Sequence, residues 1–175
     1  MQIERVNEWD LTPQLEGAIA DLLALSFGTD FGGRTYYQQR HHVRFIARSG
    51  DQVLGHMALC FRDVRLGDEL TPIWGLAEVA THPEARGKGV ATAMLDAAIA
   101  FTRTTPAAFF VLFGNRPIYA GNGFVHQPNL VTYFTLVGAK TGDIKTGQDA
   151  GLMTLSLTDR QWDKTAHLDL LGHKF

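Results

Sequence analysis

A glycine-containing loop directly before a long apolar helix is the feature that most constrains the fold of this 175-residue chain. The loop covers residues 86–89, Arg-Gly-Lys-Gly, and follows a strand candidate at 71–81. The helix candidate runs from Val90 to about Thr102, because apolar residues recur there at helical spacing and several alanines favour a helix. A strand, a glycine turn and a helix in this order indicate a sheet with a helix packed against it.

Hydrophobic patterns predict the other elements. Thr12 suits a helix N-cap and Pro13 suits the first helical position, so a helix is expected over residues 13–26. Short helical segments are expected over 36–39 and 118–121. The expected strands cover residues 1–6, 43–47, 53–66, 71–81, 107–113, 130–137 and 152–157. Residues 82–88 and 139–151 are expected to be loops, the second of them on the surface.

This order of elements predicts a mixed α/β (α+β) fold, with a largely antiparallel central sheet flanked by helices. The strands at 43–47 and 53–66 are joined by a short turn and should therefore pair in antiparallel fashion. A chain of this length fits one domain, and no linker or repeat divides it. We therefore expect a single domain over residues 1–175.

Charge and cysteine content argue against several classes of protein. The formal net charge is −2, which gives no attraction to nucleic acid or to an anionic membrane, so neither is expected as a partner. No apolar run approaches the about 20 residues of a membrane span. The single cysteine, Cys60, lies in an apolar run and can form no internal disulfide, which favours a core position and a cytoplasmic location. The histidines show no metal-ligand spacing, and no metal site is expected.

The glycine loop has the properties of an anion site. The first backbone N–H groups of a helix have no intrahelical acceptor, and the helix dipole adds partial positive charge there. Glycines allow close approach of a bulky anion, while Arg86 and Lys88 add formal charge, so a pyrophosphate would fit. A Walker loop needs Ser or Thr after its Gly-Lys, where this chain has Gly89. On the loop alone, a polar turn that merely caps a helix remains open.

The segment Thr81-His82-Pro83-Glu84-Ala85-Arg86-Gly87-Lys88-Gly89-Val90-Ala91 resembles the acetyl-CoA signature of the GNAT acetyltransferases, with matches at its defined positions Arg86, Gly89 and Ala91. A second segment, Tyr119-Ala120-Gly121-Asn122-Gly123-Phe124, resembles the Tyr-x-x-x-Gly-Phe block of the same superfamily. The resemblance covers residues 43–125 best and implies a GNAT-like fold with acetyl-CoA as co-substrate. The cofactor-binding residues that it implies are Val79, Ala80, Thr81, Arg86, Gly87, Lys88, Gly89, Val90 and Ala91.

The resemblance also implies the reaction, which is transfer of the acetyl group of acetyl-CoA to a primary amine of a small molecule. The amine would attack directly in a ternary complex, without a covalent acyl-enzyme. Tyr119 is the candidate general acid, since a phenol can protonate a leaving thiolate; a core tyrosine packing on Phe124 is the alternative. Glu78 is the candidate base or amine anchor, and a structural hydrogen-bonding role is its alternative.

The ends of the chain resemble aminoglycoside 2′-N-acetyltransferase and, more weakly, the acyltransferases of nodulation-factor synthesis. Carried over, Asp30, Asp149 and the α-carboxylate of Phe175 would face an aminosugar, and three carboxylates would attract a polycationic amine. A turn aspartate, a solvated loop residue and a frayed end are the respective alternatives. The chain departs from those enzymes at Ala77, where they carry their strand glutamate, so Glu78 replaces it only through a β-bulge.

Two other classes of function stay open. One is a non-catalytic acyl-CoA-binding module, which would keep the glycine loop and lose the acid. The other is a transferase of longer acyl chains. The sequence also leaves a homodimer open.

Overall fold

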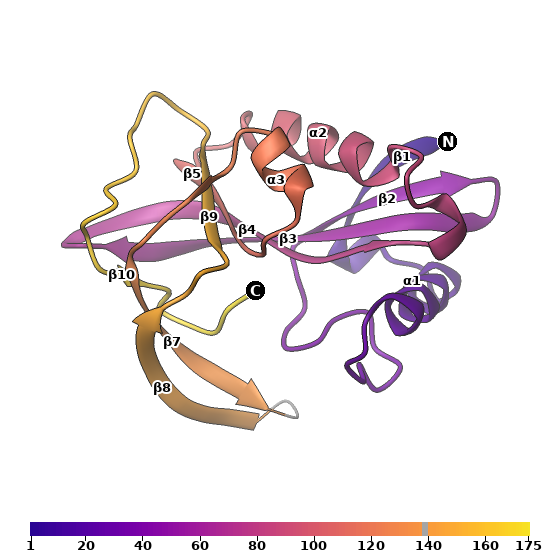
Figure 1. The fold of residues 1–175 in the computed structure, drawn as a ribbon. Coiled ribbons are helices and arrows are strands. Elements are labelled where there is room, and N and C mark those ends of the chain that lie inside the picture. Colours follow the sequence, from indigo (N-terminus) through magenta and orange to yellow (C-terminus); the bar gives the residue numbers. More distant parts are fainter. Residues whose placement is uncertain (138–139) are drawn as a thin grey trace. The chain divides into compact units, whose positions relative to one another are not determined.

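The structure is a computed structural model that describes residues 1–137 and 140–175 (Figure 1). The chain forms two compact units. Unit 1 comprises Met1–Cys60 and Ala77–Ala98, and unit 2 comprises Phe61–Leu76 and Ile99–Phe175. Three elements supply residues to both units: the strands β3 (Gln52–Leu66) and β4 (Glu69–Thr81) and the helix α2 (Val90–Thr102).

Unit 1 begins with β1 (Gln2–Asn7), a 3-10 turn η1 (Glu8–Asp10), helix α1 (Pro13–Ser26) and strand β2 (Val43–Ser49). Strand β2 pairs in antiparallel fashion with both β1 and β3. Helix α1 starts where the hydroxyl of Thr12 accepts a hydrogen bond from the backbone N–H of Leu15. Its apolar stripe packs into a buried cluster whose members are Ile19, Leu22, Leu23, Phe31, Ile46, Val53 and Ala80.

Unit 2 contains β5 (Phe109–Phe113), helix α3 (Pro117–Gly121), β6 (Val125–His126), β7 (Leu130–Val137), β8 (Lys140–Gln148), β9 (Leu152–Ser156) and β10 (Leu168–Asp169). The strand order is β6-β9-β5-β4-β3-β10-β7-β8. The β4–β5 and β10–β7 pairs are parallel, whereas the β5–β9, β6–β9, β10–β3 and β7–β8 pairs are antiparallel. The expected fold class, a mixed α/β fold with a largely antiparallel sheet, is confirmed.

Two sequence-based element predictions are wrong. Residues 37–39 form bends and Tyr36 belongs to no regular element, so the expected helix is absent; the backbone N–H of Tyr37 donates to the side chain of Glu78 at 2.6 Å. Residues 140–148 form strand β8, although the sequence there is polar; β7 supplies the hydrogen-bonding partner, and no apolar alternation is needed. Ala139, the first residue of the expected surface loop, lies outside the described residues. No helix in residues 1–137 and 140–175 is both long and apolar enough to cross a membrane.

Candidate active site

The glycine loop lies in unit 1, between the short 3-10 turn η2 (Pro83–Ala85) and the first residue of α2. Gly87 and Gly89 adopt left-handed backbone conformations, with φ of 73° and 76°. A Cβ atom at either glycine would meet nothing within 4 Å, so the backbone conformation, and not lack of space, selects glycine here. The two left-handed glycines turn the backbone between η2 and the N-terminus of α2.

A hollow of about 460 Å³ opens at this N-terminus. Its walls carry helix-start amides that have no intrahelical acceptor. The guanidinium of Arg86 donates to the carbonyl of Thr81 at 3.4 Å, and Lys88 is an exposed residue of the same loop. The arrangement can hold a pyrophosphate, as the sequence indicates. The residues that line the hollow are Thr81, Ala85, Arg86, Gly87, Gly89, Val90, Ala91 and Thr92.

Glu78 has an unusual backbone. Its φ is 52°, which is uncommon for a residue that carries a Cβ atom. A regular strand sends successive side chains to opposite faces. This alternation is interrupted at Glu78, and a left-handed residue is what one common type of β-bulge contains. The carbonyl of Glu78 accepts a hydrogen bond from the ring of His56 at 3.0 Å. Ala80 lies in the buried cluster of unit 1, whereas Val79 and Thr81 are partly exposed.

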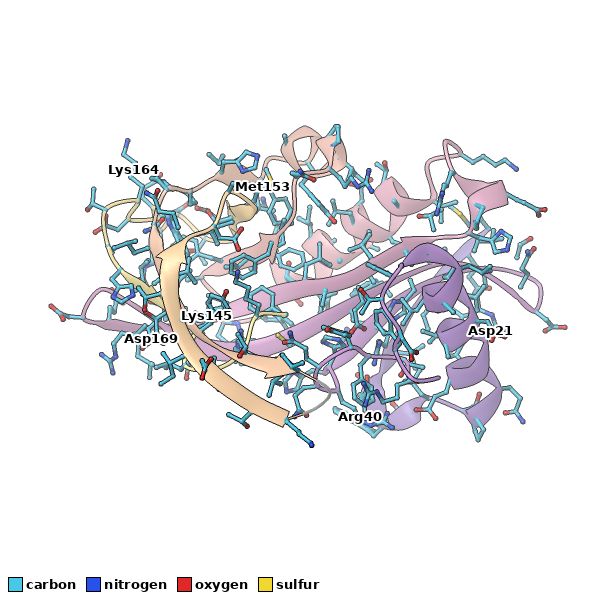
Figure 2. All side chains as sticks on the ribbon, turned by 60° about the horizontal axis from the view of Figure 1, so that its bottom comes forward. Asp21, Arg40, Lys145, Met153, Lys164 and Asp169 are labelled. Carbon is cyan, nitrogen blue, oxygen red and sulfur yellow. The ribbon has the colours of Figure 1, made fainter. Side chains whose placement is uncertain are left out.

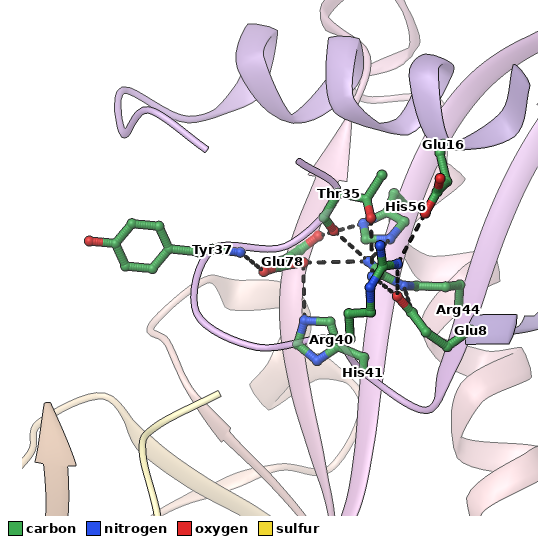
Figure 3. Close-up of polar contacts among 9 residues, drawn as sticks. All are labelled: Glu8, Glu16, Thr35, Tyr37, Arg40, His41, Arg44, His56 and Glu78. Carbon is green, nitrogen blue, oxygen red and sulfur yellow. Dashed lines mark hydrogen bonds and ion pairs between the residues drawn. The ribbon is translucent and has the colours of Figure 1, made fainter. Parts of the chain in front are cut away.

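The carboxylate of Glu78 holds the segment that precedes β2 (Figure 3). Its Oε1 accepts from the backbone N–H of Tyr37 at 2.6 Å. Its Oε2 lies 3.1 Å from Nε2 of His41, without hydrogen-bond alignment. The same oxygen lies 3.5 Å from Nη1 of Arg44. Both oxygens therefore already have donors, and the structural role that the sequence left open for Glu78 has direct support.

Arg44 lies at the centre of this network and has an exposed fraction of 0%. Its Nε donates to Oε2 of Glu8 at 2.7 Å and its Nη2 donates to Oε1 of Glu8 at 3.1 Å, which is a two-pronged ion pair. Nη1 donates to the carbonyl of Thr35 at 2.7 Å. Burial alone raises the pKa of the Glu8 carboxyl, but the hydrogen bonds and charge of Arg44, with Arg40, outweigh it and lower that pKa below its ordinary value.

The tautomer of His56 follows from its partners. The ring is fully buried and contacts the carbonyl of Glu78 through Nδ1 and the guanidinium of Arg44 through Nε2 at 3.0 Å. A carbonyl can only accept and a guanidinium can only donate, so Nδ1 carries the proton and Nε2 accepts. Burial, followed by the charge of Arg44, lowers the pKa of His56 well below its ordinary value. His56 is therefore neutral and joins Arg44 to the backbone of Glu78.

The sequence did not identify Glu8, His41, Arg44 or His56 as site residues. A signal was present for Arg44, which interrupts the apolar run of β2 between Val43 and Phe45. A charged residue in a buried strand needs a partner. His56 gives a similar signal in β3. The partners themselves come from segments far apart in the sequence, and a single sequence does not pair them.

Tyr119 lies on α3 in unit 2 and is 8% exposed. Its ring packs edge-on against Phe124, with centroids 6.2 Å apart. The ring of Tyr119 therefore packs on Phe124, as in the alternative of a core tyrosine. This contact involves the ring alone and does not decide whether the hydroxyl acts as an acid. Burial raises the pKa of the Tyr119 phenol, against the charge of Arg116, so the hydroxyl keeps its proton at neutral pH.

The three carboxylates expected to face an amine have different surroundings. Asp30, in unit 1, accepts a hydrogen bond from the N–H of Gly32 at 2.6 Å, which is the contact of a turn aspartate. Asp149, in unit 2, forms an ion pair with Lys174 and accepts from Gly151 at 2.7 Å. Burial alone raises the pKa of Asp149, but Lys174 and the Gly151 N–H outweigh it and lower that pKa.

The side chain of Phe175, also in unit 2, lies in a slot made by a glycine. A Cβ atom at Gly75 would lie 2.5 Å from the Phe175 ring. The ring of Phe113 is 5.6 Å away between centroids, and the guanidinium of Arg62 lies 4.7 Å above the Phe175 ring. The last residues are therefore packed, and they bring Phe175 and Asp149 to one part of unit 2, since Lys174 is the partner of Asp149.

The sheet and the glycine loop before α2 define an acyltransferase-type α/β domain. The family model described as an acetyltransferase (GNAT) domain matches residues 11–126, which is more than half of the chain. This chain belongs to the acetyltransferase (GNAT) family. A comparison with curated proteins finds no match.

Solved structures of the same fold are similar to this chain. A GNAT family N-acetyltransferase (YhbS) from Escherichia coli, in complex with CoA, has a TM-score of 0.65 at 19% identity, over 97% of this chain and 88% of that one. A GNAT family acetyltransferase from Brucella melitensis, in complex with acetyl-CoA, has a TM-score of 0.59 at 19% identity, over 95% and 94%. A probable N-acyltransferase from Enterococcus faecalis is longer; 74% of this chain covers 33% of it, with a TM-score of 0.59 at 16% identity. The TM-scores show that these proteins share the fold of this chain, and at these identities they show the fold alone.

Proposed function

We propose that the protein is an N-acetyltransferase that moves the acetyl group of acetyl-CoA to a primary amine of a small molecule. The observation that carries the proposal is the hollow at the start of α2, whose lining contains two left-handed glycines and the cation Arg86; Lys88 lies between the two glycines in the same loop. This hollow lies inside the segment that the acetyltransferase family model matches. The complexes of the two similar proteins with CoA and acetyl-CoA support acetyl-CoA as the co-substrate.

In this proposal the loop amides and the two cations bind the pyrophosphate, and the backbone at Val79–Thr81 pairs with the pantetheine arm. The backbone N–H of Val79 would polarise the thioester carbonyl, as an oxyanion donor does. A neutral amine attacks the carbonyl carbon and the C–S bond breaks. The amine nitrogen passes a proton to Glu78 or to water, and the leaving thiolate takes one from Tyr119, whose raised pKa keeps it protonated. Tyr119 then regains a proton from solvent, so that no net proton is lost at the site.

We assign Glu78 to anchoring the amine or to accepting its proton. Its two oxygens already accept hydrogen bonds from the backbone N–H of Tyr37 and from Arg44, which favours anchoring. The interrupted alternation at Glu78 is the change that would let it replace the strand glutamate of the aminoglycoside enzymes.

We further propose an aminosugar or aminoglycoside as the acceptor, with Asp30, Asp149 and the Phe175 α-carboxylate as its binding groups. Asp149 is already paired with Lys174, so a cationic acceptor would have to displace that lysine. We also propose that the two units act as one GNAT-type domain. We further propose that the protein is cytoplasmic, because its only cysteine, Cys60, is buried.

The experiment follows thiol release from acetyl-CoA over a panel of aminoglycosides, polyamines, amino acids and peptides. Turnover with an aminosugar that is lost in Tyr119→Phe and kept in Tyr133→Phe would support both the reaction and the acid. Binding of acetyl-CoA without turnover of any amine would sink the proposal in favour of a binding module. Faster turnover of longer acyl-CoA esters would indicate a transferase of longer acyl chains.

A further inference from the structure

The ammonium group of Lys174 lies among charged and aromatic side chains of unit 2. Its Nζ donates to Oδ2 of Asp149 in an ion pair. The same nitrogen lies 4.1 Å from the centre of the Tyr133 ring and 5.0 Å from the centre of the Phe113 ring. A carboxylate and the faces of aromatic rings are groups that bind an ammonium ion in proteins. We call the Asp149 carboxylate and these two ring faces the ammonium site.

The turn between β8 and β9 holds Asp149 through bonds that do not involve Lys174. Oδ1 of Asp149 accepts from the N–H of Gly151 at 2.7 Å, which leaves Oδ2 for a cation. The N–H of Leu152 donates to the carbonyl of Asp149 at 3.0 Å, and the N–H of Gly114 donates to the carbonyl of Gly151 at 2.7 Å. The carboxylate therefore keeps its place when the lysine side chain leaves.

The two rings are also held by contacts of their own. Tyr133 lies on β7, opposite Lys145 of β8, which Figure 2 labels, and Phe113 is the last residue of β5. Both rings pack against a buried cluster of unit 2, so their positions do not depend on Lys174. A phenylalanine ring at position 133 would offer the same face. The members of the cluster are Val64, Leu66, Ile73, Ala108, Phe109, Val111, Val131, Leu152, Leu168 and Leu170.

Only the side chain of Lys174 has to move for the ammonium site to open. Its neighbours along the chain are fixed, since the carbonyl of His173 accepts a hydrogen bond from Arg62 and the Phe175 ring fills the slot at Gly75. The side chain of Lys174 is 25% exposed, so water reaches it. An ion pair with this exposure is weak, and rotation about the bonds of the lysine stem breaks it.

The charge of the site decides which amino group of an acceptor it can hold. A protonated amine has no lone pair with which to attack a thioester, so the reacting amine has to be neutral. The ammonium site binds the protonated form, as the contacts of Lys174 show. An acceptor that uses this site therefore carries at least two amino groups, of which one reacts and another is bound here.

We propose that the ammonium site binds a non-reacting, protonated amino group of the acceptor, and that Lys174 is a built-in competitor which the acceptor displaces. The inference rests on the proposed function, in which Asp149 binds a cationic acceptor. It adds the two ring faces to that site and restricts the acceptor to amines with two or more amino groups. Because Lys174 is tethered, its effective concentration at the site is about millimolar or higher, and a bound acceptor has to overcome it.

The first test measures binding without turnover, by nuclear magnetic resonance titration of the full chain with spermidine, a linear polyamine. The amide of Gly151 is the reporter, because it donates to Asp149. Lys174→Met removes the ammonium and keeps an apolar stem, so the dissociation constant of spermidine should fall about fivefold, the ratio expected when a weak ion pair no longer competes. Adding Asp149→Asn should reverse this gain, because asparagine keeps an acceptor for Gly151 and lacks the charge.

Lys164→Met is the matched control. It makes the same charge change at an exposed position of unit 2, which Figure 2 labels, and should leave the dissociation constant close to that of the wild type. Circular dichroism confirms that each variant folds. Equal dissociation constants in Lys174→Met and the wild type, or a gain that survives Asp149→Asn, would overturn the inference.

Kinetics separate this inference from the proposed reaction. With an aminoglycoside that is turned over, Lys174→Met should lower the KM of the acceptor about fivefold and leave the KM of acetyl-CoA unchanged, whereas a monoamine should show no such gain. An unchanged KM of the aminoglycoside would sink the inference and leave the reaction standing. Tighter binding of spermidine by Lys174→Met, without turnover of any amine, would support the ammonium site and count against the reaction.

Discussion

Gly87 shows how a single residue can be tested for a binding role apart from its backbone strain. Gly50, in a turn of the same unit, also has a left-handed φ, of 59°, and a Cβ atom at either glycine would have nothing within 4 Å. Alanine at either position should cost about 1–2 kcal/mol in folding stability through backbone strain alone. Only Gly87 belongs to the proposed pyrophosphate loop.

We therefore expect Gly87→Ala to raise the KM for acetyl-CoA about tenfold, since loss of one hydrogen bond to a charged group has about that effect. Gly50→Ala should unfold at a similarly lowered temperature and keep the KM of the wild type. Steady-state kinetics and thermal unfolding measure both quantities. Equal KM values in the two variants would show that the loop does not bind the cofactor.

Arg44 is the residue whose removal should cost the most stability within the network of unit 1. Arg44→Met would leave the carboxylate of Glu8, and in part that of Glu78, without their buried counter-charge. Breaking a buried ion pair on one side costs about 3–5 kcal/mol. Arg40→Met is the control, because Arg40 is half-exposed and contacts Glu8 and Glu16 from the surface. Urea denaturation should show a loss below about 1 kcal/mol for Arg40→Met.

At the scale of elements, strand β3 and helix α2 approach each other at Gly55 in unit 1. A Cβ atom there would lie 2.6 Å from Cε of Met94 and 2.8 Å from Cγ1 of Val90. Gly55→Ala should therefore cost about 1–3 kcal/mol through overpacking and displace the first turn of α2. Gly17→Ala, in helix α1 where a Cβ atom meets nothing within 4 Å, should instead gain up to about 1 kcal/mol.

A second substitution tests the cause of that cost. Met94→Ala removes the side chain nearest to the new methyl group, so Gly55→Ala should cost less in the Met94→Ala background than in the wild type. A double-mutant cycle measured by thermal unfolding gives the coupling. Additive effects of the two substitutions would contradict direct contact between β3 and α2 at this point.

Elements with strong local signals are those that the sequence predicts well. Helix α1 begins and ends at the expected residues, because Thr12 and Pro13 mark its start and apolar spacing defines its length. Helix α2 also has its expected bounds. Strand β8 could not be predicted, because a solvent-exposed strand carries no apolar alternation. The Glu78 network could not be predicted either, since its residues meet only through the fold.

At the scale of the whole molecule, the buried His56 should make stability depend on pH. Its pKa is lowered in the folded state, so below the ordinary histidine pKa of about 6.5 the unfolded chain takes up a proton that the folded chain does not. The contribution of neutral His56 is thus complete above about pH 6.5, and it is lost as the pH falls toward the folded pKa.

The free energy of unfolding should therefore decrease from pH 7 to pH 5, with a slope of up to about 1.4 kcal/mol per pH unit from this one proton. His56→Asn keeps a donor for the carbonyl of Glu78 and cannot titrate, so its slope should be smaller by that amount. His42, whose pKa burial also lowers, leaves a residual slope in both proteins. Urea titrations at several pH values give the slopes, and identical slopes would contradict a neutral His56.

The left-handed backbone at Glu78 also limits how this position can change over generations. A glutamate codon becomes a glycine or an aspartate codon through a single base change. Glycine adopts this backbone readily but removes the carboxylate that holds Tyr37, whereas aspartate keeps the charge on a shorter arm. Each of these substitutions therefore either removes the negative charge or shortens the side chain that carries it. Descendants that retain glutamate, against its backbone cost, would carry a record of selection on the carboxylate itself.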